Sequence, residues 1–123
     1  MKSLLLIVAL TFTLGGCQKV PPNLSPAGTA AFKGTQVIKA LDGLRDEAIL
    51  LNAQVPPIVS TDTTRKVVTY HKSAITIIHN APSGWKPTVQ SGLTELQKNL
   101  SASDAARLAP YFTLAQTLIR EVN

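Results

Sequence analysis

The two histidines carry the most versatile chemistry in this sequence, and their spacing decides what they can do. His71 and His79 lie eight residues apart, which is about two turns and 12 Å of rise along a helix. Zinc holds its nitrogen ligands at about 2 Å, so the two imidazoles cannot bind one ion. His71 also falls among regularly spaced apolar residues, a pattern typical of a hydrogen-bonded core histidine.

The acidic residues form no pattern typical of a catalytic or metal site. Asp46 and Glu47 are the only adjacent acidic pair, and neighbours on a helix point about 100° apart, unlike the facing carboxylates of a glycosidase. The sequence has no Glu-x-x-His pair, phosphate-binding glycine loop or nucleophile elbow. Haem and iron–sulfur motifs are also missing. We therefore predict a non-enzyme without cofactor or metal, and a hydrolase using Asp or His is the least favoured hypothesis.

Cys17 is the only cysteine, and it follows an N-terminal pattern with its own chemistry. Met1 and Lys2 give a short positive start, residues 4–14 are mostly apolar, and Leu14-Gly15-Gly16-Cys17 comes next. Such an apolar run is too short to span a bilayer and is typical of a cleaved signal peptide. Leu14-Gly15-Gly16-Cys17 resembles the lipobox of bacterial membrane lipoproteins. The resemblance implies that residues 1–16 are removed and that Cys17 is joined to a diacylglyceryl group, detectable by palmitate labelling.

The alternative is an ordinary secreted protein in which Cys17 is incidental. Lipidation gives the cysteine a use, whereas a lone thiol in an oxidising compartment is a liability. Two or three acyl chains hold a protein essentially permanently, since each buried CH₂ contributes about 0.8 kcal/mol. We expect the protein on a cell-envelope membrane. With Gln18 rather than Asp after the cysteine, the resemblance implies the periplasmic face of the outer membrane if the source has two membranes, and otherwise the outer face of the cytoplasmic membrane.

Composition predicts one domain behind a short tether. Residues 17–25 hold the lipidated cysteine and a Pro-containing stretch, which at about 3.1 Å per residue reaches about 25 Å. Residues 26–123 are long enough to bury a core without disulfides. The net charge of +5 is scattered, with Arg65-Lys66 the only adjacent basic pair, which argues against nucleic acid. An anionic bilayer is the more natural partner, although a merely solvated basic surface explains the charge as well.

The apolar residues of the domain follow a helical period. Ser25-Pro26 is a helix start, and Pro56-Pro57 ends the segment. A turn signal at Asp42-Gly43 leaves a break in this first helix open. The expected apolar face consists of Val37, Leu41, Leu44, Ala48, Leu51 and Val55.

Residues 60–80 have two possible structures. Their β-branched residues allow a hairpin, but apolar and polar side chains alternate in steps of three or four, which favours a helix. Ser60 and Asp62 supply the cap and the first-turn acid. The expected buried face holds Val67, His71, Ala74, Ile78 and Ala81, and the expected exposed face holds Arg65, Thr69, Lys72, Thr76 and His79.

Two further helices complete the expected fold. Pro87 opens one, with Val89, Leu93, Leu96 and Leu100 on one side. Ser101-Ala102-Ser103-Asp104 resembles a capping box at the start of the last, in which Pro110 predicts a kink or a restart. The prediction is an all-α fold, a small antiparallel bundle of about four helices.

Two aromatic features bear on function. Trp85 is the only tryptophan and lies in a turn, where it is either a partner contact or a lid over the end of the bundle. Either Tyr111 or Phe112 must point away from the centre of the apolar face. We expect a lipid-anchored binding or structural module with a protein partner. The alternative is a bundle that binds a small apolar ligand or lipid, with the glycines of the first helix providing space.

Overall fold

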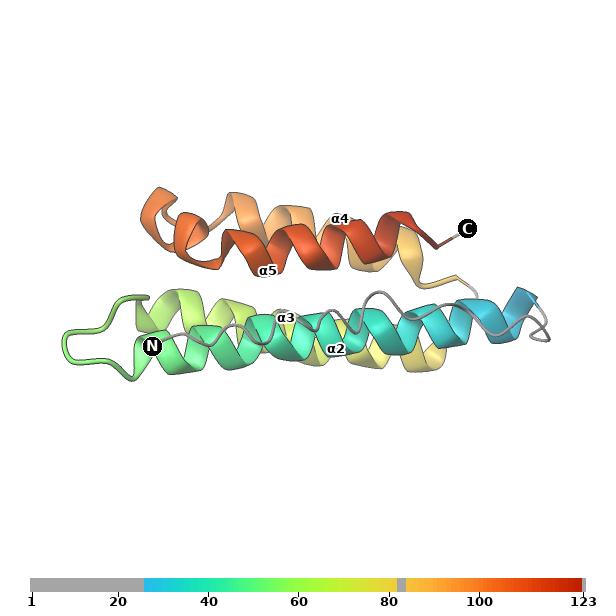
Figure 1. Ribbon diagram of the computed structural model, residues 1–123, viewed down its shortest axis with the longest axis horizontal. Coiled ribbons are helices and arrows are strands. Elements are labelled where there is room, and N and C mark those ends of the chain that lie inside the picture. The colour runs from blue at the N-terminus through green and yellow to red at the C-terminus, as the bar shows by residue number, and fades with distance from the viewer. Residues whose placement is uncertain (1–25, 82–83, 123) are drawn as a thin grey trace.

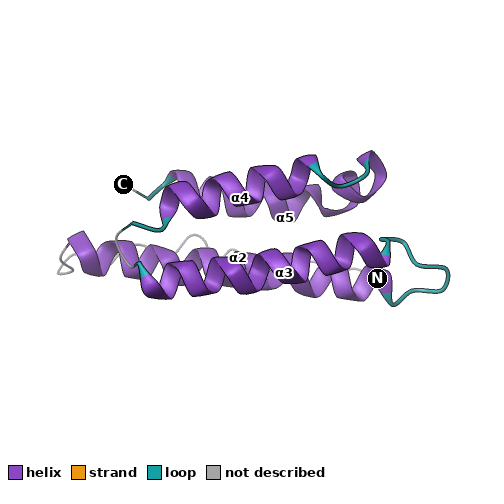
Figure 2. Cartoon of the chain, turned by 180° about the vertical axis from the view of Figure 1, so that it is seen from behind, coloured by secondary structure: helices purple, strands orange, loops and turns teal. Residues whose placement is uncertain are grey.

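The computed structural model describes residues 26–81 and 84–122, and these residues form helices and loops without a strand (Figure 2). The helices are α2 (Pro26–Asn52), α3 (Thr61–Asn80), α4 (Lys86–Lys98) and α5 (Ala102–Arg120). The predicted all-α class is confirmed. The predicted signal peptide, Cys17 and the predicted tether lie outside the described residues.

The four helices form a two-layered antiparallel bundle, with α2 and α3 in one layer and α4 and α5 in the other (Figure 1). Helices that follow one another pack side by side, and α5 closes the bundle against α2. Lys33 Nζ donates a 2.6 Å hydrogen bond to the carbonyl oxygen of Glu121, so the start of α2 lies beside the end of α5. We call this the basal end, and the end with the α2–α3 loop, residues 53–60, the distal end.

Helix α2 runs without a break past Gly43 and ends before the proline pair. Four members of its predicted face, Val37, Leu41, Leu44 and Ala48, are buried. Val55 does not belong to that face: the helix ends at Asn52, and Val55 is 97% exposed in the loop. The residue before a proline avoids the helical conformation, so a helix cannot carry Val55 into Pro56.

Residues 61–80 form the predicted helix rather than a hairpin. Ser60 Oγ accepts a 3.1 Å hydrogen bond from the Thr63 amide and caps the first turn. The predicted polar positions are exposed, and Val67, His71, Ala74 and Ile78 are buried. Ala81, beyond the helix, is partly buried and packs against the core. The period of the apolar side chains therefore outweighed the β-branched composition.

The last two helices start where their turn residues predict. Pro87 stands in the first turn of α4, and Val89, Leu93 and Leu96 are buried. Ser101 caps α5, which continues through Pro110 without a restart. Pro110 is exposed, so the carbonyl that loses its amide partner lies on the solvent side of the helix.

Candidate functional site

Apolar side chains that face solvent gather at the distal end. Val55 is accompanied there by Leu50, which is 56% exposed, and by the exposed Ile49 and Ile58. A single exposed apolar residue is common, but several around one short loop form a candidate interaction surface. We call Ile49, Leu50, Val55 and Ile58 the apolar tip.

The loop that carries the apolar tip is held in one shape by its own hydrogen bonds. Asn52 Nδ2 donates to the carbonyl oxygen of Val59 at 3.0 Å and to Thr61 Oγ1 at 3.2 Å. The Ile58 amide donates to the carbonyl oxygen of Leu51 at 3.0 Å. The Val59 side chain is fully buried and fixes the loop to the bundle. A partner meeting this loop therefore needs to order little of it on binding.

A buried carboxylate ties the base of this loop to the opposite layer. Asp104, at the start of α5, is 7% exposed. Its Oδ2 accepts hydrogen bonds from Thr63 Oγ1 at 2.6 Å, Ser60 Oγ at 3.1 Å and the Ser60 amide at 3.3 Å. The hydrogen bond from Thr63 lowers the pKa of Asp104 most, and those from Ser60 and Ser101 add to it against the opposing effect of burial. We call this group the Asp104 clamp.

The sequence pattern predicted a different role for Asp104. As predicted, the Ser101 hydroxyl accepts a hydrogen bond from the Asp104 amide, at 3.2 Å. The Asp104 carboxylate, which we expected only at the start of its own helix, also reaches across to α3. The partners of this contact were visible in the sequence, because Ser60 and Thr63 lie near one predicted helix start and Asp104 lies near another. The local pattern did not show that the two helix starts meet in space.

His71 lies in the interior between α2 and α3, 5% exposed, as the core interpretation predicts. Its Nε2 contacts Asp42 Oδ1 at 2.6 Å, and because a carboxylate only accepts, Nε2 is the donor. Arg45 Nη1 lies 3.3 Å from the same nitrogen, but the guanidinium donates instead to Asp46 Oδ1, at 2.9 Å from Nη2 and 3.0 Å from Nε. The contact between His71 and Asp42 links α3 to α2 and gives His71 a structural role.

The neighbouring acids Asp46 and Glu47 turn to different partners. Asp46 pairs with Arg45, whereas Glu47 lies against the Tyr111 hydroxyl on α5. Burial, followed by the Glu47 charge and hydrogen bond, raises the pKa of Tyr111. Tyr111 is half-buried against the core and Phe112 is fully buried, so a wide buried face accounts for both aromatics.

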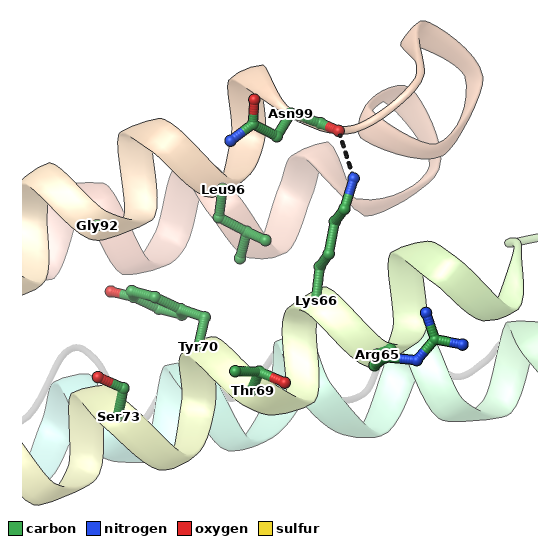
Figure 3. A pocket seen from close by; sticks show the side chains of 8 residues that line it. All are labelled: Arg65, Lys66, Thr69, Tyr70, Ser73, Gly92, Leu96 and Asn99. Carbon is green, nitrogen blue, oxygen red and sulfur yellow. Dashed lines mark hydrogen bonds between the residues drawn. The ribbon is translucent and has the colours of Figure 1, made fainter.

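A shallow groove of about 450 Å³ lies between α3 and α4 (Figure 3). Tyr70 and Leu96 lie within it, and the Tyr70 hydroxyl donates to the carbonyl oxygen of Val89 at 2.7 Å. Lys66 Nζ reaches the carbonyl oxygen of Asn99 at 3.1 Å, and the Arg65 side chain extends away along α3 (Figure 3). Burial raises the pKa of Tyr70 well above its ordinary value. The groove therefore offers apolar surface and engaged polar groups, not an acid–base pair.

Trp85 is buried rather than offered to a partner. Its side chain is 1% exposed, so it cannot serve as the exposed contact proposed from its position in a turn. A Cβ added to Gly34 of α2 would lie 3.3 Å from Trp85 Nε1 and 2.9 Å from Ile78 Cγ2. Gly34 is therefore needed so that α2 can approach these side chains. The space expected beside the first-helix glycines for a ligand is occupied at this position.

The described residues also bear on a metal site and on a membrane-spanning helix. Within residues 26–81 and 84–122, no three His, Asp or Glu side chains converge on a metal-sized site. His79 is exposed at the end of α3, away from His71. None of the described helices combines the length and the apolar character needed to cross a membrane. No protein-family model, curated protein or solved structure matches the chain.

Proposed function

We propose that this chain is a lipid-anchored bacterial envelope protein that acts as a binding or structural module and meets a protein partner through the apolar tip. The observation that carries the proposal is the group of exposed aliphatic side chains at the end of α2 and on the loop that follows, which is held by its own hydrogen bonds. Burying a fully exposed aliphatic side chain contributes about 1.5–3 kcal/mol. Val55 is nearly fully exposed, whereas Ile49, Leu50 and Ile58 are about half exposed and would contribute about half as much. Several together support a specific contact with an apolar hollow on a partner.

The position of the tip fits a module anchored at its N-terminal side. The proposed anchor, Cys17, and its tether join the bundle at the start of α2, at the basal end. Helix α2 has 27 residues and is therefore about 40 Å long. The apolar tip lies at the far end of that helix, so a bundle standing on its anchor presents the tip away from its own membrane.

The anchor is tested by labelling. Wild-type full-length chain expressed in a bacterium should incorporate labelled palmitate and partition into detergent, because the Cys17 sulfur accepts the lipid. The variant Cys17→Ser should do neither. Equal labelling of the two chains would contradict the lipoprotein hypothesis and leave an ordinary secreted domain.

The partner surface is tested by site-specific crosslinking in the source cell. A photoreactive residue at Val55 should give a discrete protein adduct, whereas the same residue at the exposed Thr76 of α3 should not. Ile58→Asp in the chain labelled at Val55 should remove the adduct while the helical signal stays unchanged. The same adducts from both positions would refute the assignment of the tip.

A ligand-binding function is supported by one observation, the groove between α3 and α4. Its volume of about 450 Å³ falls in the range of small-molecule sites. Tyr70 and Leu96 provide apolar surface for a lipid chain. Native mass spectrometry of the Cys17→Ser chain, which lacks the proposed lipidation site, tests this alternative. A co-purified lipid that is lost on Thr69→Asp, a change at an exposed residue of the groove, would favour ligand binding over partner binding.

A further inference from the structure

The groove between α3 and α4 is basic toward its distal end and apolar along its floor. Arg65 and Lys66 line it near the start of α3, and Tyr70 follows about one turn later. Leu96 of α4 points toward α3 between Tyr70 and Lys66 (Figure 3). Among the described residues, the lining of the groove includes no acid, so its own charge is positive.

The floor of the groove is held in place before any ligand arrives. The Tyr70 hydroxyl donates to the carbonyl oxygen of Val89 at 2.7 Å, which fixes the ring across the space between the two helices. A Cβ added to Gly92 would lie 2.9 Å from Tyr70 Cε1, so the backbone of α4 lies directly against the ring. A ligand meeting this floor therefore needs to order little of it.

The two cations of the groove already share one carboxylate. Asp62 Oδ1 lies 3.2 Å from Arg65 Nη1, and Asp62 Oδ2 lies 3.1 Å from Lys66 Nζ. The Asp62 side chain is 63% exposed, and ion pairs at such surface positions are weak, so another carboxylate can replace it. Lys66 Nζ also donates to the carbonyl oxygen of Asn99 at 3.1 Å, and these two acceptors use two of its three protons.

We propose that the groove binds a single-chain carboxylate of the fatty-acid class. Its chain lies along Tyr70 and Leu96, and its carboxylate takes the place of Asp62 on Arg65 and Lys66. This inference rests on the ligand-binding alternative proposed above and is independent of the apolar tip and of the anchor. The contacts of Asp62 identify the head group, because they show that both cations reach a single carboxylate.

The size of the groove identifies the rest of the ligand. Its volume of about 450 Å³ lies in the lower part of the range for small-molecule sites, about 300–1,000 Å³. A site of this size suits one acyl chain rather than the two chains of a phospholipid.

The test compares two probes on the full-length Cys17→Ser chain. Decanoate and decanol have the same chain length and differ in the charge of the head group, and both are used below the concentration at which they self-associate. Binding is read from the amide NMR shifts of Ser73 and Gly92, so that binding by other segments is not counted. We expect decanoate to bind about five- to tenfold more tightly than decanol at low salt, with a smaller difference at high salt.

Removing the internal carboxylate should strengthen binding. Asp62→Asn should raise the affinity for decanoate about threefold to fivefold and leave that for decanol unchanged, because only decanoate competes with Asp62. Asp46→Asn is the matched control: Asp46 is 66% exposed, pairs with Arg45 and loses the same charge outside the groove. It should change neither affinity by more than about twofold. General damage to α3 would not raise the affinity for one head group alone.

Removing the cations should have the opposite effect. The double variant Arg65→Gln and Lys66→Gln should lower the affinity for decanoate to that for decanol. The matched double variant Lys39→Gln and Arg107→Gln, which removes two exposed cations outside the groove, should keep the preference for decanoate.

The outcomes separate the carboxylate site from the ligand-binding alternative. Equal affinities of the Cys17→Ser chain for the two probes, or no gain on Asp62→Asn, would overturn the carboxylate site and leave an uncharged ligand for the groove. Equal losses of the preference in the two double variants would overturn it as well, since net charge would then govern binding. If neither probe shifted the groove amides, the ligand-binding alternative would fail together with this inference.

Discussion

Removing the carboxylate of the Asp104 clamp should release α3 from α5 at the distal end. Asp104→Ala deletes the acceptor of three hydrogen bonds, the shortest being the 2.6 Å bond from Thr63 Oγ1. The Thr63 side chain is buried and loses the acceptor of its hydroxyl, whereas the exposed Ser60 can turn to water. The variant therefore has a defined physical consequence at each donor.

The magnitude follows from the chemistry of these donors. A hydrogen bond to a charged group contributes about 1.5–3 kcal/mol, and a buried hydroxyl left without a partner costs about 1–3 kcal/mol. These effects overlap, because breaking the Thr63 bond and orphaning its hydroxyl are one event. We expect the free energy of unfolding to fall by about 2–4 kcal/mol, which lowers Tm by roughly 10–20 °C.

The assay is chemical and thermal denaturation of the full-length chain, with Asp62→Ala as the control. Asp62 is also a first-turn acid, on α3, but its side chain is 63% exposed and pairs only with Arg65 and Lys66 at the surface. Its removal should cost less than about 1 kcal/mol. If Asp104→Ala cost no more than Asp62→Ala, the reasoning about the clamp would be wrong.

The same clamp predicts a dependence on pH. The pKa of Asp104 is lowered in the folded state, so the unfolded chain binds more protons between that pKa and the ordinary value of about 3.9. The contribution of the clamp is therefore complete above about pH 5 and is lost as the pH falls through the folded pKa. Asp104→Asn should lack this acid-labile contribution, and its stability deficit against the wild type should shrink as the pH falls below about 4.

Two other predictions concern packing. Gly34→Ala should destabilise the bundle by about 1–3 kcal/mol, because its Cβ would lie 2.9 Å from Ile78 Cγ2, whereas Gly43→Ala meets its nearest neighbour at 3.5 Å and should be neutral or stabilising by up to about 1 kcal/mol. Thermal unfolding of the pair decides this, and an equal loss in both variants would refute it. Trp85→Ala should cost about 3–5 kcal/mol in the same assay, and a loss below about 1 kcal/mol would contradict the burial of this side chain.

Spacing along the chain was sufficient to predict the helices and the class of fold. Val67, Ala74 and Ile78 recur at helical intervals, and Ser60 and Ser101 supply the side-chain oxygens that cap two helix starts. These features depend on neighbours within one or two turns, so local spacing predicts them. The same spacing predicted the burial of His71, because a residue on the apolar face of a helix is carried into the core.

Tertiary structure alone decided which residues face one another and which remain exposed. Asp104 meets Thr63 across 41 positions of sequence, and Asp42 meets His71 across 29, because the turns bring separate helices into register. Val55 was expected in the core, but the helix ends before it and leaves it in solvent. Trp85 was ambiguous until the packing of α2 at Gly34 covered it. Such contacts depend on how helices approach in space, which a periodic pattern within one helix does not specify.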